Sequence, residues 1–280
     1  MKIVKTIEEV RAAVAGWRKE SASIGLVPTM GYLHEGHGSL ITKACEENDR
    51  VIVSVFVNPT QFGPGEDLEA YPRDLNKDAA YCEALGADLI FHPEPEEMYP
   101  KGFVSYINMD VLTQELCGIT RPIHFKGVCT VVGKLFLITQ PDRAYFGKKD
   151  YQQLAIIRRM VADLNFPVEV VGCPIIREPD GLAKSSRNTY LTPEEREAAL
   201  VLSRAVRLGE QMVKDGETDA KTVADAMKAL ISAQPLARID YVKAVDGMTM
   251  QQIDVIKEPA LVAIAVYIGK TRLIDNFEVA

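Results

Sequence analysis

The chain has 280 residues, of which 47% are hydrophobic and 25% are charged, as in an ordinary soluble globular protein. Its net charge of −7 argues against a general nucleic-acid-binding surface, although it leaves room for a local basic pocket. No apolar run approaches the roughly 20 residues that span a bilayer, and the charged N-terminus lacks a signal-peptide core. We therefore expect a cytoplasmic protein with no nucleic-acid or membrane partner.

The five cysteines are scattered along the chain and form no CxxC pair. This pattern indicates neither a zinc ribbon nor a disulfide framework, so we expect reduced, mostly buried thiols.

The first two thirds of the chain alternate between strand and helix patterns. A helix is predicted over 5–20, with Thr6 as N-cap and Glu9 completing a capping box. An apolar strand over 24–27 follows, which Pro28 is expected to end, and a helix begins near His34. The remaining predicted elements are strands at 51–57, 88–92, 143–146 and 168–173, and helices at 74–85, 128–140 and 151–164. This alternation predicts an α/β fold with a Rossmann-like parallel sheet and helices on both faces.

The pattern changes after about residue 176. One helix is predicted from Thr192 to Lys214 and a second over 219–233, and three closely spaced strands follow. We therefore expect two domains: residues 1–176, which bind the nucleotide, and residues 177–280, a smaller α+β domain.

The stretch IGLVPTMGYLHEGHGSLIT, residues 24–42, combines a strand, a turn and a helix start, which are the parts of a nucleotide site. His34 and His37 are three residues apart and point the same way, and their N–H groups suit phosphate oxygens. The pair also allows a metal site or plain surface histidines. A zinc site needs a third ligand, and His92 and His124 lie in unrelated contexts.

Three further stretches carry polar side chains. Lys184, Ser185, Ser186 and Arg187 place two cations and two hydroxyls in one loop, which suits a polyphosphate or a solvated surface. Gly147 to Asp150 follow a strand, where a lysine suits phosphate and an aspartate suits ribose or a helix cap. Asn58, Gln61 and Arg121 add amides and a cation that suit a small polar substrate or an ordinary turn.

Together these stretches resemble the pantothenate synthetase family, whose members are pantoate–β-alanine ligases of the HxGH class I adenylyl-transfer superfamily. The matching segments are PTMGYLHEGH, VSVFVNPTQF with YPR, RPIHFKGVCTVV, YFGKKDYQQL and DGLAKSSRNTYL. The resemblance implies a ligase that joins pantoate to β-alanine through a pantoyl adenylate. It releases pyrophosphate and AMP and makes the coenzyme A precursor pantothenate.

The resemblance also implies the roles of individual residues. The implied catalytic residues are His37, His34, Lys149 and Arg187. The implied ATP-binding residues are Met30, Gly31, Tyr32, Leu33, His34, Glu35, Gly36, His37, Gly147, Lys148, Lys149, Asp150, Ile176, Lys184, Ser185, Ser186 and Arg187. The implied pantoate-binding pair is Gln61 and Gln153, and Asn58 and Arg121 complete the predicted substrate-binding set.

The family uses ATP with Mg²⁺, and it implies a cytoplasmic homodimer whose C-terminal domain works as a lid. We predict no metal ligand in the protein itself, with Asp78 a candidate for an outer-shell contact to the ion. The chain departs from the usual family pattern at Gly38, Lys148 and Lys184. Inside a helix, Gly38 costs roughly 1 kcal/mol relative to alanine. Two rival functions remain open, a simple nucleotidylyltransferase and a catalytically silent nucleotide-binding protein.

Overall fold

The computed structural model describes residues 1–279 and divides into two compact units. The first unit comprises Met1–Met109, Arg121–Lys148 and Ile156–Pro174. The second comprises Asp110–Thr120, Lys149–Ala155 and the residues from Ile175 onward. The second unit thus includes two short segments from the first two thirds of the sequence.

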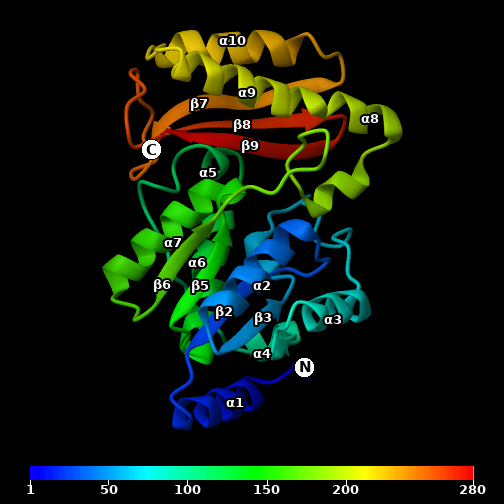
Figure 1. Cartoon of the computed structure of the whole chain (residues 1–280), viewed down its shortest axis with the longest axis vertical. Coiled ribbons are helices and arrows are strands. Elements are labelled where there is room, and N and C mark those ends of the chain that lie inside the picture. The colour runs from blue at the N-terminus through cyan, green and yellow to red at the C-terminus, as the bar shows by residue number, and fades with distance from the viewer. Residues whose placement is uncertain (280) are drawn as a thin grey trace. The chain divides into compact units, whose positions relative to one another are not determined.

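The first unit is built on a six-stranded parallel sheet with the strand order β1-β4-β3-β2-β5-β6 (Figure 1). The strands are β1 Lys2–Val4, β2 Ile24–Thr29, β3 Arg50–Val55, β4 Leu89–Phe91, β5 Arg143–Gly147 and β6 Glu169–Cys173. Its helices are α1 Ile7–Lys19, α2 Glu35–Glu47, α3 Leu75–Ala84, α4 Pro95–Met98 and α6 His124–Thr139, followed by α7 Tyr151–Leu164, whose first turn belongs to the second unit. The predicted parallel α/β sheet is confirmed.

The strand order reverses at β2, which pairs with β3 on one side and β5 on the other. In open parallel sheets, ligands bind at the carboxyl ends of the strands beside such a reversal. The segments that follow β2, β3 and β5 are therefore the ones best placed to form a site.

Both faces of this sheet are covered. All of Val51, Ile52, Val53, Ser54 and Val55 are buried, although consecutive strand residues point to opposite faces. Leu40, Ile41 and Ala44 of α2 pack with Cys82 of α3 against one face, in a cluster with Val27 and Val53. A strand that is buried on both faces belongs in the middle of a parallel sheet, as its β-branched, apolar sequence predicts.

Two local expectations about the strands were wrong or incomplete. Strand β2 continues through Pro28 to Thr29, and Pro28 pairs with Ser54. The missing N–H of Pro28 is tolerated because the pairing of β2 with β5 covers only Gly25 and Leu26. Strand β1, a three-residue strand at the edge of the sheet, was not predicted at all.

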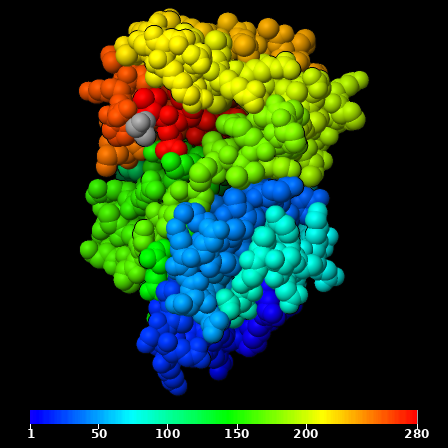
Figure 2. Space-filling view, viewed as in Figure 1, coloured from blue at the N-terminus to red at the C-terminus, as the bar shows by residue number. Residues whose placement is uncertain are grey.

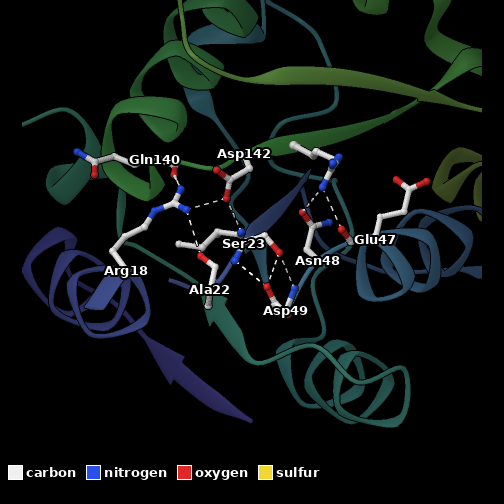
Figure 3. Close-up of polar contacts among 10 residues, drawn as sticks. Arg18, Ala22, Ser23, Glu47, Asn48, Asp49, Gln140 and Asp142 are labelled. Carbon is white, nitrogen blue, oxygen red and sulfur yellow. Dashed lines mark hydrogen bonds and ion pairs between the residues drawn. The ribbon is translucent and has the colours of Figure 1, made fainter. Parts of the chain in front are cut away.

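A polar network ties together the amino ends of β2 and β5 (Figure 3). Arg18 of α1 donates to Asp142 at 2.8 Å and to the Gln140 carbonyl at 2.6 Å. Asp142 also accepts the N–H of Ile24 at 2.6 Å, and Asp49 accepts the hydroxyl of Ser23 at 2.6 Å. Burial alone would raise the pKa of Asp142, but the bonds from Arg18 and Ile24 lower it below its ordinary value.

The second unit contains a three-stranded antiparallel sheet in the order β7-β8-β9. Its elements are α5 Cys117–Thr120, η3 Ser186–Tyr190, α8 Pro193–Ala198, α9 Leu200–Lys214, α10 Ala220–Ser232, β7 Ala237–Asp246, β8 Ala260–Ile268 and β9 Thr271–Val279. Figure 2 shows α9 and α10 as a yellow to orange layer over the red C-terminal strands. Val206, Met227 and Phe277 belong to the core between them.

The single helix predicted from Thr192 to Lys214 is two helices. The capping box of Thr192 and Glu195 starts α8, with Pro193 at its first position, as predicted. Ala199 then separates α8 from α9. Alanine carries no signal for a helix break, so the sequence alone did not reveal the boundary.

The cysteines are free thiols, as expected, and three of the five are buried. Burial raises the pKa of both Cys82 and Cys129 to about 12, so these thiols remain protonated and unreactive near neutral pH. Among residues 1–279, none of the helices is long and apolar enough to cross a membrane.

Candidate active site

The two histidines of the HEGH stretch cap helix α2. His34 is the N-cap residue, and its Nδ1 accepts the backbone N–H of Gly36 at 3.1 Å. His37 lies at the third helical position, and its Nδ1 accepts the backbone N–H of His34 at 3.3 Å. Together they form a capping box in which imidazoles replace the usual hydroxyl and carboxylate. The rings lie 4.1 Å apart between centroids.

These hydrogen bonds determine where the imidazole protons lie. A backbone N–H can only donate, so each Nδ1 must be an acceptor and carry no proton. In the neutral rings, the proton is therefore on Nε2 of both His34 and His37. Two N–H donors at a helix N-terminus, at the carboxyl end of β2, are suited to the oxygens of a phosphate.

The turn before α2 is held by a buried carboxylate. Asp78 of α3 is 1% exposed and accepts the N–H of Tyr32 at 2.8 Å and of Leu33 at 2.7 Å. Gly31 and Tyr32 have φ values of 83° and 53°, a left-handed pair that turns these N–H groups toward Asp78. Burial raises the pKa of Asp78 above its ordinary value, and the two N–H bonds counter part of that rise.

The unusual Gly38 is explained by a neighbouring helix. A Cβ at this position would lie 2.2 Å from the hydroxyl oxygen of Tyr81 in α3. The glycine therefore provides the space in which the tyrosine packs against α2. The departure from helix propensity is compensated by close packing between α2 and α3.

Gln61 lies in η1, Pro59–Gln61, just beyond β3, and its amide orientation is fixed by Asn58. The Oδ1 of Asn58 accepts the N–H of Thr60 at 3.3 Å, and its Nδ2 donates to the Gly127 carbonyl at 3.2 Å. These two backbone partners leave Asn58 only one orientation, in which Nδ2 donates to Oε1 of Gln61 at 3.0 Å. Gln61 therefore turns its NH2 group away from Asn58, toward the sulfur of Met30 at 3.2 Å.

Asn58 itself is 1% exposed, and both of its polar atoms are bonded within the protein. The Tyr99 hydroxyl donates to its Oδ1 at 2.7 Å, and burial raises the pKa of this tyrosine to about 12. The structure thus places Asn58 behind Gln61, where it orients the glutamine. Tyr99 was missed at the level of sequence, because nothing in its local pattern connects it to residue 58.

Arg121 lies beside the same segment. It forms an ion pair with Glu66 and is 3.5 Å from the carbonyl of Gln61. The ring of His124 contacts the same carbonyl, with 3.1 Å between Nδ1 and the oxygen. Gly127 of α6 has no Cβ, and one would lie 2.5 Å from the Cα of Gln61. The backbone of Gln61 thus packs directly on α6.

The remaining predicted nucleotide and substrate residues, apart from Gly147 and Lys148, belong to the second unit. Lys149 forms an ion pair with Asp150 at 3.1 Å. Gln153 is half-buried, whereas the adjacent Gln152 is 6% exposed and bonds the backbone of Leu112 and Glu115. Of the two glutamines, Gln153 is the one available to a ligand.

The predicted phosphate loop begins at the end of a short hairpin. Lys184 donates its N–H to the Ile176 carbonyl at 2.9 Å, and Arg177 pairs with Ala183 in an antiparallel bridge. The hydroxyl of Ser185 then accepts the N–H of Arg187 at 3.3 Å and starts η3. Ile176 and the loop 184–187 are therefore joined by backbone hydrogen bonds.

Among residues 1–279, no group of three or more His, Cys, Asp or Glu side chains is arranged to hold a metal ion. The metal-pair alternative for His34 and His37 would need such a group. Their Nδ1 atoms are in addition occupied by backbone N–H groups.

Known proteins resemble this chain over its whole length. A family model described as pantoate-beta-alanine ligase matches residues 2–278. A pantothenate synthetase of Ruminiclostridium cellulolyticum is 66% identical over 277 residues, covering 99% of this chain and 98% of the relative. One from Clostridium acetobutylicum is 56% identical with 99% of each chain covered.

Solved structures agree with the sequence matches. A pantothenate synthetase from Thermus thermophilus is 48% identical and superposes with a TM-score of 0.94, with 99% of each chain covered. A pantoate-beta-alanine ligase from Francisella tularensis, complexed with beta-gamma ATP and beta-alanine, is 36% identical with a TM-score of 0.82 and covers 99% of this chain and 97% of that one. The chain therefore belongs to the pantoate–β-alanine ligase family.

Proposed function

We propose that this protein joins pantoate to β-alanine in an ATP-dependent reaction that proceeds through a pantoyl adenylate and releases pyrophosphate and AMP. The observation that carries the proposal is the family match over residues 2–278, supported by a 66% identical pantothenate synthetase. The product, pantothenate, is the precursor of coenzyme A.

In the first step, an oxygen of the pantoate carboxylate attacks the α-phosphorus of ATP, and the bond to pyrophosphate breaks. No proton is transferred to the protein, so the catalyst needs to position the two anions and stabilise negative charge. The Nε2–H groups of His34 and His37 supply such donors. Lys149 and Arg187 are proposed to add positive charge at the phosphates.

In the second step, the uncharged amine of β-alanine attacks the acyl carbon of pantoyl adenylate. AMP leaves with the electron pair of the broken C–O bond, and the nitrogen loses one proton to solvent as the amide forms. We propose that Gln61 and Gln153 hold pantoate through both steps. The orientation of Gln61 supports this assignment, because its NH2 donor suits the hydroxyl and carboxylate oxygens of pantoate.

The nucleotide would be held by the remaining predicted residues. We propose that Asp150 binds the ribose, Ile176 contacts adenine, and Lys184, Ser185, Ser186 and Arg187 bind the phosphates. The hydrogen bond between Lys184 and Ile176 supports a joint role, since it links the adenine and phosphate contacts.

Magnesium fits this site as an ion bound mainly by the triphosphate. Asp78 is 1% exposed and accepts one backbone N–H on each oxygen, so we propose that it acts on the ion indirectly, by holding the turn at Tyr32 and Leu33. When bound with ATP, Mg²⁺ would offset the negative charge that develops on the phosphates.

We also infer a cytoplasmic homodimer whose second unit works as a lid over the acyl adenylate, an intermediate that water would hydrolyse. The family match over residues 2–278 is the support for both inferences. Light scattering after gel filtration should give about twice the mass of 30.9 kDa, and a monomer at micromolar concentration would contradict the dimer.

The deciding experiment is an AMP-release assay with ATP and pantoate, run with and without β-alanine. We expect AMP and pantothenate to form in equal amounts and only when all three substrates are present. If AMP formation does not depend on β-alanine, the ligase assignment fails. Stable accumulation of a nucleotide-linked product would then favour the simple nucleotidylyltransferase, and no turnover would favour a silent nucleotide-binding protein.

A further inference from the structure

Two adjacent buried residues near the C-terminus contact both nucleotide segments of the second unit. Asp275 and Asn276 lie in strand β9 and are 2% and 5% exposed. Polar side chains this deeply buried are uncommon unless their hydrogen bonds are satisfied by specific partners. Here the partners are Lys149, which is predicted to bind ATP, and Arg177, which directly follows the predicted adenine contact Ile176.

Asp275 holds the hairpin that leads into the phosphate loop. It accepts Nη1 of Arg177 at 2.7 Å and Nη2 at 2.9 Å, which is a bidentate pair. Arg177 follows Ile176 directly, and its Nη1 also donates to the Gly181 carbonyl at 3.1 Å across the hairpin. Fixing the guanidinium of Arg177 therefore fixes the hairpin from which the loop 184–187 begins.

Asn276 holds the other segment. Its Nδ2 donates to the backbone carbonyl of Lys149 at 2.9 Å. Its own N–H donates to Oδ1 of Asp275 at 2.8 Å, so the two residues are linked. Because consecutive strand residues point to opposite faces, β9 reaches the two segments from its two sides.

We propose that Asp275 and Asn276 are positioning residues that set the placement of Lys149 relative to the loop 184–187, and thereby the affinity for the ATP phosphates. The proposal rests on the assignment of those residues to ATP under the proposed function. Neither residue needs to touch the nucleotide. They hold Lys149 and the loop 184–187 in one arrangement before ATP binds. Binding then does not have to supply the conformational entropy of ordering these segments.

The test compares two neighbouring substitutions that create the same side chain. Asn276→Leu removes the donor to Lys149 and keeps a similar volume. Phe277→Leu is the matched control. Phe277 lies in the same strand, but its side chain belongs to the apolar core with α9 and α10 and makes no hydrogen bond to Lys149 or to the hairpin at Arg177. Arg177→Lys keeps the charge but loses the bidentate geometry, and so tests the other half of the pair.

ATP affinity is measured by titration calorimetry on the full-length protein, with thermal melting alongside. We expect the Kd for ATP to rise about tenfold in Asn276→Leu and in Arg177→Lys, which is the effect of losing one or two hydrogen bonds that order the site. In Phe277→Leu it should stay within about twofold even though the melting temperature falls. The KM for β-alanine should stay unchanged in all three.

Wild-type ATP affinity in folded Asn276→Leu and Arg177→Lys would overturn the proposal. An equal loss of ATP affinity in Phe277→Leu would also overturn it, because the rise in Kd would then reflect the lower stability of the fold and not the lost hydrogen bond. Failure of the proposed function is a separate result, since it appears as absence of β-alanine-dependent AMP release in the wild-type protein.

Discussion

The imidazole rings of His34 and His37 each cap helix α2 and, under the proposed function, also donate to a phosphate. Nδ1 caps helix α2, and Nε2–H is the donor that a phosphate would meet. The sequence predicted the two residues but not the protonated nitrogen, because that depends on hydrogen bonds made by the helix backbone.

The two tasks of His37 can be separated by substitution. In His37→Asn, Oδ1 takes the place of Nδ1 as the cap acceptor, while the Nε2 donor is lost. We expect the melting temperature to stay near that of the wild type and kcat to fall by about 100-fold or more, as for other donors that stabilise transition-state charge. His37→Ala should lose turnover and also part of the cap energy, about 1 kcal/mol. Near-normal turnover in His37→Asn would remove this donor from the mechanism.

The orientation of Gln61 leads to a second prediction. Tyr99→Phe deletes the hydroxyl that donates to Asn58 and changes little else in volume. The KM for pantoate should rise several-fold, in line with the roughly 1 kcal/mol of one hydrogen bond, while the Kd for ATP stays constant. Tyr106→Phe is the control, because Tyr106 is 46% exposed and its ring makes an edge-to-face contact with Phe103 and a cation–π contact with Lys126. Equal effects of the two substitutions would contradict the role of Tyr99.

The fold shows partners of the predicted site residues that the sequence did not reveal. Asn58 was predicted to contact substrate, yet its polar atoms are used within the protein. Asp78 was considered for a water-mediated contact to magnesium, and its bonds to Tyr32 and Leu33 emerge only from the fold. Such roles depend on partners that are distant in sequence, and no local pattern encodes them.

At the scale of elements, the approach of η1 to α6 depends on one glycine. Because a Cβ on Gly127 would lie 2.5 Å from backbone atoms of Gln61 and of Thr60, neither element can yield without moving Gln61. We expect Gly127→Ala to lower the free energy of unfolding by about 1–3 kcal/mol and to reduce kcat/KM for pantoate.

The same helix offers a control. A Cβ on Gly133 would meet the Cδ1 of Ile107, the end of a flexible side chain that can move aside. Gly133→Ala should therefore change kcat/KM for pantoate little, as measured by the AMP-release assay. A larger loss of activity in Gly133→Ala than in Gly127→Ala would contradict this account.

Elements with a complete local signal were predicted well. Thr6 and Glu9 form the predicted capping box of α1, and the apolar, β-branched run from Val51 became the central part of the sheet. Expectations failed where tertiary contacts decide the outcome. Pro28 lies inside a strand because the pairing of β2 with β5 has already ended before it, and α8 and α9 separate at an alanine.

At the scale of the whole molecule, the network around Arg18 and Asp142 lies at the amino ends of β2 and β5 (Figure 3). The predicted residues His34, Gln61 and Gly147 instead lie at or beyond the carboxyl ends of β2, β3 and β5. Stability and catalysis should therefore separate. Asp142→Asn is expected to lower the melting temperature only slightly, because a surface ion pair contributes about 1 kcal/mol or less. The value of kcat should stay within about twofold, because the network lies at the opposite ends of the strands.

The pKa of Asp142 also determines how its contribution changes with pH. The folded state lowers this pKa below 3.8, so the contribution is fully present above the unfolded value. It is lost as the pH falls through the lowered pKa of the folded protein. Urea unfolding of wild type and Asp142→Asn should thus differ most above about pH 5 and converge in strong acid. A constant difference down to about pH 2 would contradict this assignment.

Gly38 and Tyr81 occupy one small volume between α2 and α3, so these two positions should co-vary. Gly38→Ala alone should destabilise the protein by about 1–3 kcal/mol, whereas in a Tyr81→Ala background it should stabilise it by up to about 1 kcal/mol through helix propensity. A double-mutant cycle measures that change of sign. The corresponding expectation for relatives is that an apolar side chain at position 38 accompanies a residue other than tyrosine at position 81. The glycine in α2 would then reflect selection on the packing of Tyr81 and not a requirement of the predicted site.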